Sequence, residues 1–158
     1  MVLTTLDDHG YSRFQDLAFV QCFDAQETRR MREELGTKLK LTQLIGENDW
    51  DEADTDFDRL RTAAGLKNIA EYAQSIGPAM KHVWAPSENS NQATQTRLVA
   101  LARKENLLVH PYTLRADALP DYASSFEQLV NMFCDAGVDG MFTDFPDQAL
   151  RIIEERGE

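Results

Sequence analysis

The sequence predicts an α/β fold with a parallel sheet, and three observations support this prediction. Short apolar runs of strand length alternate with segments of helical periodicity, so that five strand-then-helix units follow one another. Consecutive units of this kind form parallel strands joined by right-handed crossovers. The 158 residues, of which 42% are hydrophobic, suffice for one domain with an ordinary core. A doubly wound nucleotide-binding sheet is the weaker alternative, because no glycine-rich phosphate-binding loop occurs.

Local patterns place each element of this fold. Apolar runs of strand length predict strands over residues 17–23, 39–45, 79–84, 107–109 and 140–145. Apolar residues at helical spacing predict helices over residues 1–9, 25–35, 66–75, 93–106, 126–136 and 146–156. Because the chain starts inside the first of these helices, we expect a truncated protein.

Capping residues mark where two of the helices begin. Asp24 directly precedes the second helix, and its short carboxylate suits an N-cap. The last helix starts with Pro146, a residue that the first helical turn tolerates, and either Asp144 or Asp147 is expected as its N-cap. These signals agree with the strands that precede both helices.

The segment 47–58 is rich in carboxylates and has no helical or strand periodicity, so it is expected to be a loop after the second strand. Its aspartates Asp54, Asp56 and Asp58 have the spacing of a calcium-binding loop. However, Arg59 stands where the turn glycine of such a loop belongs. A solvated loop is the prediction, with calcium binding as the alternative.

The net charge of −11 argues against nucleic acid and anionic membranes as partners, because both attract clustered lysine and arginine. No apolar run approaches the ~18 residues of a membrane span, and no signal peptide is recognisable. Cys22 and Cys134 form no C-x-x-C pair and lie in apolar surroundings. We expect buried free thiols rather than a disulfide.

Polar and aromatic residues follow the strand 107–109 directly. His110, Tyr112, Thr113 and Arg115 stand where this strand ends, and α/β barrels build their sites at the carboxyl ends of strands. His110 suits either a structural role in an apolar strand or a general base. Arg115 suits either a phosphate or the nearby Asp117.

Four stretches carry a family resemblance. They read FVQCFDAQETRRMREEL, LTQLIG, LVHPYTLRADALPDY and AGVDGMFTDFPDQAL. Together they resemble the closing portion of the glycerophosphodiester phosphodiesterases, in the bacterial type that carries HPYT at its seventh strand. The resemblance implies a (β/α)8 TIM barrel, of which residues 1–158 are the last five β/α units, a partial barrel. A whole barrel takes ~250 residues, so a missing amino-terminal half is expected.

The resemblance also implies an activity. The family hydrolyses glycerophosphodiesters, which are small molecules, to an alcohol and glycerol 3-phosphate with a divalent cation, Ca²⁺ or Mg²⁺. Such a cation would resolve the conflict between an acidic chain and an anionic substrate. The family's HR motif does not occur here, and the two E-x-D spacings, Glu47 to Asp49 and Glu52 to Asp54, lie in the acidic loop rather than on the early strand where the family carries this pair. We therefore expect no catalytic residue and no metal ligand on this chain.

Substrate-binding residues are carried over at four positions. Gln21 and Phe23 match the family's pocket-lining S/Q-x-F, and Tyr112 and Thr113 match the aromatic and threonine pair of the seventh strand. The resemblance implies that these residues line the distal wall of the pocket, with the Tyr112 ring against the glycerol. Core packing is the alternative for each. For Asp144 the resemblance implies a positioning role.

A second interpretation belongs to another functional class. The chain then is a half-barrel binding or interaction module without catalysis, which pairs with a copy of itself or with a separate amino-terminal fragment. A partial barrel has two unpaired sheet edges, so self-association is expected. Val20, Leu44, Val109 and Phe142 are expected to face the barrel interior. A periplasmic location is suggested by the resemblance alone.

Overall fold

The computed structural model describes residues 2–11 and 18–157 of the chain. Its strands are β1 (Phe19–Cys22), β2 (Lys40–Ile45), β3 (Ser75–Pro78), β4 (Trp84–Pro86), β5 (Ala93–Gln95) and β6 (Leu108–Val109). Its α-helices are α1 (Val2–Asp8), α2 (Ala25–Glu33), α3 (Phe57–Leu60), α4 (Ala63–Ile69), α5 (Leu98–Lys104), α6 (Phe126–Asp135) and α7 (Pro146–Arg156). Two 3-10 turns, η2 (Asn48–Trp50) and η3 (Met80–His82), follow β2 and β3.

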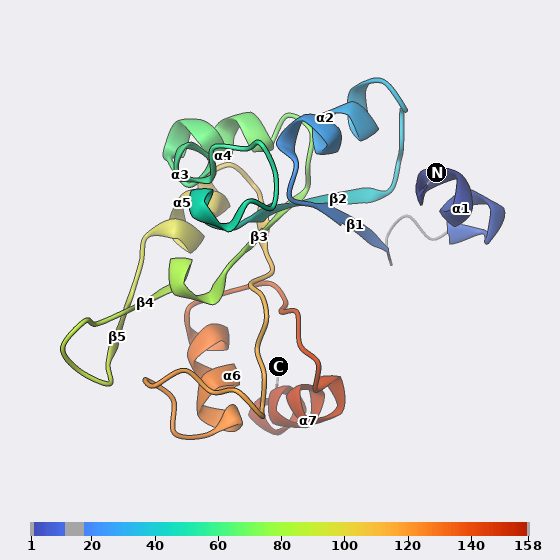
Figure 1. Ribbon diagram of the computed structural model, residues 1–158. Coiled ribbons are helices and arrows are strands. Elements are labelled where there is room, and N and C mark those ends of the chain that lie inside the picture. The colour runs from blue at the N-terminus through green and yellow to red at the C-terminus, as the bar shows by residue number, and fades with distance from the viewer. Residues whose placement is uncertain (1, 12–17, 158) are drawn as a thin grey trace.

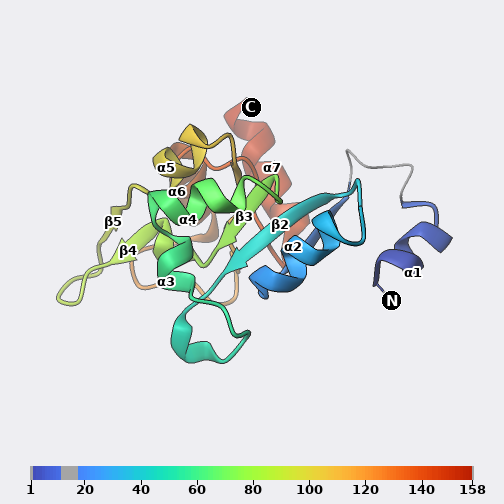
Figure 2. The same cartoon turned by 90° about the horizontal axis from the view of Figure 1, so that it is seen from above.

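The central sheet is parallel and has the order β1-β2-β3-β6. Figure 1 shows helices α2 to α5 gathered along one side of these strands and α6 and α7 apart from them, in the lower part of the view. The antiparallel pair β4 and β5 forms a separate two-stranded sheet. Figure 2 shows α1 at one end of the molecule, next to α2 and far from the β4–β5 hairpin. The predicted α/β class with a parallel sheet is therefore confirmed.

The two faces of the sheet differ in what they pack against. Leu41 and Ile76 are fully buried in the core that the helices cover. On the opposite face Gly77 lies so close to β2 that an added Cβ would sit 2.6 Å from Leu44 Cδ2. Leu44 thereby occupies the space beside Gly77 and lies outside the helix-covered core.

A buried amide fixes the end of β1 against β2. The Gln43 Nε2 group donates to the carbonyls of Phe23 at 2.9 Å, Leu44 at 3.0 Å and Cys22 at 3.3 Å. The Tyr72 hydroxyl donates to Gln43 Oε1 at 3.2 Å, and burial raises the pKa of Tyr72 to about 12. A buried polar group with all its partners rigidifies its surroundings, so this network holds the backbone at Phe23 in place.

Arg32 joins α2 to the sheet and to the segment before β3. Its guanidinium donates to the carbonyls of Tyr72 at 3.0 Å, Leu39 at 2.9 Å and Thr37, and to Gln74 Oε1 at 2.7 Å. Burial lowers the pKa of Arg32, and the four acceptors are neutral groups. One side chain therefore satisfies four acceptors from two separate segments, the one before β2 and the one before β3.

Local signals predicted where α2 and α7 begin, although α2 ends at Glu33 and not at the predicted residue 35. The Asp24 carboxylate accepts hydrogen bonds from the backbone N–H groups of Gln26 and Glu27, which confirms the predicted N-cap. Helix α7 spans the predicted residues 146–156. Its N-cap residue is Phe145, however, and no side chain caps it. The expectation of Asp144 or Asp147 at this position is wrong.

The prediction for residues 66–84 is wrong in register. The helix α4 ends at Ile69, the strand is Ser75–Pro78 rather than residues 79–84, and residues 80–82 form a 3-10 turn. Gly77 resembled a helix terminator in the sequence, but the structure places it inside β3. Its missing side chain makes room for Leu44.

Two more segments differ from the prediction. Residues 93–95 form β5, so the predicted helix 93–106 is shortened to α5. Residues 140–145 form no ladder, and only an isolated bridge joins Leu114 to Thr143. The neighbouring segment contains Pro111, which has no N–H to donate to a ladder. The described sheet thus has four parallel strands, and a partial barrel of five units is not confirmed.

The remaining side-chain predictions have mixed outcomes. Leu44 and Phe142 line one pocket, and their expected place in a barrel interior stays a prediction. Val20 and Val109 are paired in register with Leu41 and Ile76, so they face the helices, and the prediction for them is wrong. Both cysteines are free but only half-buried. Residue 17, the start of the first predicted strand, lies outside the described residues.

Candidate functional site

A pocket of about 320 Å³ lies at the carboxyl ends of β1 and β2 and the segments that follow β6. It is lined by Gln21, Phe23, Leu44, Tyr112, Thr113, Phe142, Thr143 and Asp144. The four residues carried over from the family resemblance are all in this set. They come from two segments about ninety positions apart, and the parallel sheet brings them together.

An aromatic wall forms one side of this pocket. The rings of Phe23 and Tyr112 meet edge to face, with centroids 5.8 Å apart and planes at 90°. Phe23 also contacts Phe57 of α3, at 6.1 Å and 83°. Edge-to-face pairs of this kind are a favourable geometry for aromatic rings. The segment that ends β1, the helix α3 and the segment after β6 therefore each contribute one ring to this wall.

The Tyr112 hydroxyl anchors its ring to β2. It donates to the Ile45 carbonyl at 3.0 Å. Burial raises the pKa of Tyr112, and the nearby carboxylates of Glu52 and Glu47 raise it further. The phenol thus stays neutral and remains a donor. The Tyr112–Thr113 peptide bond, directly after this ring, is cis.

Two polar side chains in the pocket are available to a ligand. Within residues 2–11 and 18–157, neither the Gln21 amide nor the Thr113 hydroxyl has a hydrogen-bond partner. Thr143 differs, because its hydroxyl donates to the Leu114 carbonyl at 2.7 Å and accepts from Phe145 N at 3.0 Å. Gln21 and Thr113 therefore offer donors and acceptors beside an aromatic surface, which suits a small polyol.

An ion pair occupies the rim of the pocket. Arg115 donates to Asp117 through Nε at 2.9 Å and Nη2 at 2.8 Å, and through Nη1 to Asp144. The neighbouring Arg115 holds the pKa of Asp117 below its usual range. Of the two partners considered for Arg115, a phosphate and Asp117, the structure shows Asp117. Asp144 is a second partner. Asp144 connects the start of α7 to the segment after β6.

The lining residues do not fit a divalent cation. Asp144 is the one carboxylate among them, and it is paired with Arg115. Over the ranges that the structure describes, no three His, Cys, Asp or Glu side chains form a group able to hold a metal. The loop aspartates Asp54, Asp56 and Asp58, which have the spacing of a calcium-binding loop, form no such group either. Metal ions prefer several oxygen ligands at one point, which these residues do not offer.

His110 lies away from the pocket lining. Its ring contacts the edges of Phe19, at 5.0 Å between centroids, and Phe142, at 6.4 Å. A Cβ added at Gly140 would be 3.1 Å from the ring. Burial lowers the pKa of His110, although the Asp139 carboxylate opposes this shift. This packing favours the structural role over the general base.

A charged cluster next to the pocket was not predicted from the sequence. Glu47 accepts from Lys81 at 2.8 Å and from Arg61 at 3.5 Å, and its carboxylate lies 3.3 Å from His82 Nε2. The Lys81 ammonium also lies 5.3 Å from the Trp50 ring centroid. No local pattern could indicate this cluster, since its members come from three segments that only the fold brings together.

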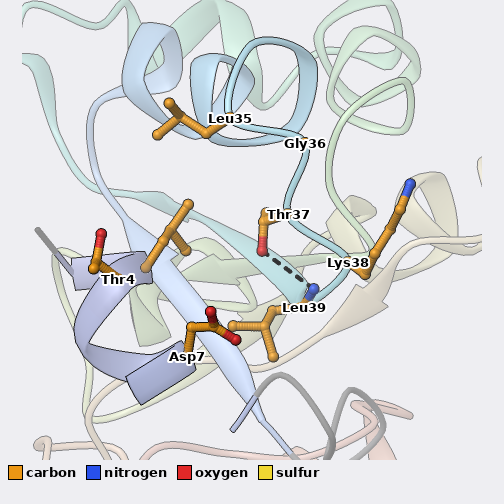
Figure 3. A pocket seen from close by; sticks show the side chains of 8 residues that line it. Thr4, Asp7, Leu35, Gly36, Thr37, Lys38 and Leu39 are labelled. Carbon is orange, nitrogen blue, oxygen red and sulfur yellow. Dashed lines mark hydrogen bonds between the residues drawn. The ribbon is translucent and has the colours of Figure 1, made fainter. Parts of the chain in front are cut away.

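Another pocket, of about 410 Å³, lies at the opposite ends of the strands. It is bounded by α1 and by the segment between α2 and β2, where Leu39 N donates to the Thr37 hydroxyl at 3.3 Å (Figure 3). Leu39 directly precedes β2, so this pocket is at the amino end of the strands. Parallel α/β folds place their sites at the carboxyl ends. The smaller pocket with Tyr112 is therefore the candidate site.

Sequence comparison assigns the chain to a family. The sequence model of the glycerophosphoryl diester phosphodiesterase family matches residues 1–148. The chain belongs to this family. It is 30% identical over 168 aligned positions to a glycerophosphodiester phosphodiesterase of Haemophilus influenzae, covering 96% of the chain and 46% of that relative. A relative with the same name from Treponema pallidum is 25% identical over 169 positions, covering 97% of the chain and 48% of the relative.

Solved structures show the same fold at lower identity. A Silicibacter pomeroyi protein assigned to the glycerophosphoryl diester phosphodiesterases superposes with a TM-score of 0.66 at 20% identity, covering 99% of this chain and 43% of that one. A glycerophosphodiester phosphodiesterase of Parabacteroides distasonis superposes with a TM-score of 0.62 at 14% identity, covering 99% of this chain and 50% of that one. The chain thus spans about half the length of the relatives it matches. In the described ranges, no helix has the length and apolar character needed to cross a membrane.

Proposed function

We propose that this chain supplies the distal wall of the substrate pocket in a glycerophosphodiester phosphodiesterase of TIM-barrel type. The substrate would be a glycerophosphodiester, hydrolysed in the full-length form to an alcohol and glycerol 3-phosphate. The family membership supports the reaction class. A periplasmic location is part of the proposal and rests on the resemblance alone.

The gathering of Gln21, Phe23, Tyr112 and Thr113 at one pocket is the observation that carries this proposal. A glycerol group has an apolar carbon face and hydroxyls at its edge. The Tyr112 ring offers a surface for the carbon face, and Thr113 and Gln21 have hydrogen-bonding capacity that no described residue uses. These groups would bind and orient the glycerol without taking part in proton transfer.

The acid–base groups and a divalent cation, Ca²⁺ or Mg²⁺, would come from residues other than those described here. Phosphodiester hydrolysis by such enzymes needs a cation to stabilise charge on the phosphoryl oxygens. With a net charge of −11, the chain would otherwise repel an anionic phosphodiester. The role left to this chain is binding and orientation of the glycerol.

The purified chain is expected to show no measurable hydrolysis of glycerophosphocholine with Ca²⁺, Mg²⁺ or Mn²⁺. The reason is the lack of a metal-holding group among the described side chains. A coupled assay for glycerol 3-phosphate measures this, with the Haemophilus influenzae relative as the positive control. Robust hydrolysis that EDTA abolishes would contradict the division of roles proposed above.

The second candidate function is an interaction module, and the unpaired edge of β1 favours it. Among the described residues β1 pairs only with β2, so its other edge presents free N–H and C=O groups. Pairing with a second copy is the simplest way to satisfy them, since two-fold assemblies are the commonest. The chain is therefore also proposed to self-associate.

At micromolar concentration we expect a dimer or larger species in analytical ultracentrifugation. Dilution should shift the distribution toward the monomer, because edge pairing is an equilibrium between separate chains. A single monomeric boundary at all concentrations, together with cooperative thermal unfolding, would show that the described sheet is stable without a partner.

A further inference from the structure

A small basic pocket lies between the end of α3, the turn η3 and the start of α5. It has a volume of about 240 Å³ and is lined by Arg61, His82, Thr96, Arg97, Leu98 and Leu101. No carboxylate lines it, although the chain has 27 acidic and 16 basic residues other than histidine. We call it the Arg97 pocket. It is separate from the pocket that contains Tyr112, with which it shares no lining residue.

Arg97 brings an unmatched positive charge to this pocket. Within the described ranges its guanidinium makes no hydrogen bond and no ion pair. The sequence from residue 89 to 104 contains no aspartate or glutamate. No acid on its own segment is therefore available to neutralise it.

Arg61 adds donors that its present partners do not use up. Its Nη1 group donates to the Gly46 carbonyl at 3.0 Å and to the Glu47 carboxylate at 3.5 Å and lies 2.9 Å from His82 Nε2, and Nη2 donates to Asp58. A guanidinium has five N–H donors. The Nε hydrogen and one Nη2 hydrogen have no partner among the described residues. The Arg61 side chain is 22% exposed, so these donors can meet a ligand.

His82 contacts Arg61 and two acceptor groups through one ring nitrogen. Its Nε2 atom lies 2.9 Å from Arg61 Nη1, 3.1 Å from the Gly46 carbonyl oxygen and 3.3 Å from the Glu47 carboxylate. Burial lowers the pKa of His82, and Arg61 lowers it further. The Thr96 hydroxyl donates to the His82 carbonyl at 2.5 Å and so ties η3 to the start of α5. The Nδ1 atom of His82 has no partner among the described residues.

We propose that the Arg97 pocket binds a phosphate group, as free phosphate or as a phosphate monoester. Guanidinium groups bind phosphate oxygens through paired, charge-assisted hydrogen bonds, which Arg97 and the free edge of Arg61 can supply. The His82 Nδ1 atom, which has no partner among the described residues, adds a polar contact point. Leu98 and Leu101 give the pocket an apolar side suited to a short carbon chain. This proposal does not depend on the phosphodiesterase function.

Titration of the ¹⁵N-labelled chain with inorganic phosphate at pH 7, followed by NMR, tests the proposal. The His82 ring and the Arg97 Nε–H signals should shift with a dissociation constant of about 1 mM or tighter. Ethyl phosphate distinguishes the two ligand sources. If ethyl phosphate binds more tightly than inorganic phosphate, the leucine side of the pocket contacts the carbon chain. If the two bind equally, the pocket recognises the phosphate group alone.

Substitutions separate specific binding from general ion effects. Arg97→Ala should weaken binding at least about tenfold, because a charged hydrogen-bonding partner is lost. Arg151→Ala is the matched control, since Arg151 is an exposed arginine on α7 and lines no described pocket. Arg97→Ala binding phosphate as tightly as the wild type would overturn the proposal. So would His82 shifts that sodium chloride reproduces at equal ionic strength.

Discussion

Replacing Arg32 by methionine is expected to lower the free energy of unfolding by about 3 kcal/mol. Methionine keeps much of the side chain's length and helix propensity but cannot donate hydrogen bonds. The carbonyls of Tyr72, Leu39 and Thr37 and the Gln74 amide oxygen would each lose a donor in a partly buried setting. Helix α2 would then lose its polar attachment to the start of β2. Urea unfolding followed by circular dichroism measures the loss.

Arg30→Met on the same helix is the matched control. Arg30 is exposed, and its side chain donates two hydrogen bonds to Glu27, three residues earlier in α2. Exposed pairs of this kind contribute little to stability, so no measurable change is expected. Equal midpoints for the two variants would show that the Arg32 hydrogen bonds are dispensable.

Replacing Gly65 by alanine is expected to destabilise the chain by about 2 kcal/mol, although alanine favours helices over glycine. Gly65 lies inside α4 where α3 crosses closely. An added Cβ would overlap the Arg59 carbonyl oxygen and sit 2.7 Å from Leu60 Cα. Backbone atoms cannot rotate away, so α3 must shift. Differential scanning calorimetry measures the loss.

The Gly65 substitution also bears on the candidate site. Helix α3 contains Phe57, whose ring supports Phe23 in the aromatic wall. Lys67→Ala, on the exposed side of α4, is the control and should leave the unfolding temperature nearly unchanged. If Gly65→Ala raised the unfolding temperature, the close approach of α3 and α4 would be contradicted.

Local chemistry decided which elements the sequence could predict. The second helix begins at Asp24, whose carboxylate caps it, and α7 starts with Pro146, so both helices were placed correctly. The strand β3 was missed because Gly77 resembles a terminator when read alone. Its place in the sheet depends on register with β2 and on the volume of Leu44, which is a property of two distant segments.

The candidate site also depends on segments that are distant in the sequence. Composition and spacing alone gave no reason to join Gln21 with Thr113, and the family resemblance supplied that connection. The ends of parallel strands then bring these residues to one pocket. The cluster of Glu47 with Lys81 and His82 had no such guide, so only the structure reveals it.

Binding of glycerophosphocholine to the chain itself tests most directly whether the Tyr112 pocket receives the glycerol of a phosphodiester. In NMR titrations, we expect shifts of the Gln21 side-chain amide and the Thr113 signals in the wild type. Tyr112→Phe should retain them, because the ring remains, and Tyr112→Ala should lose them. Shifts confined to other parts of the chain, or equal binding by Tyr112→Ala, would contradict the pocket-wall role proposed for this chain.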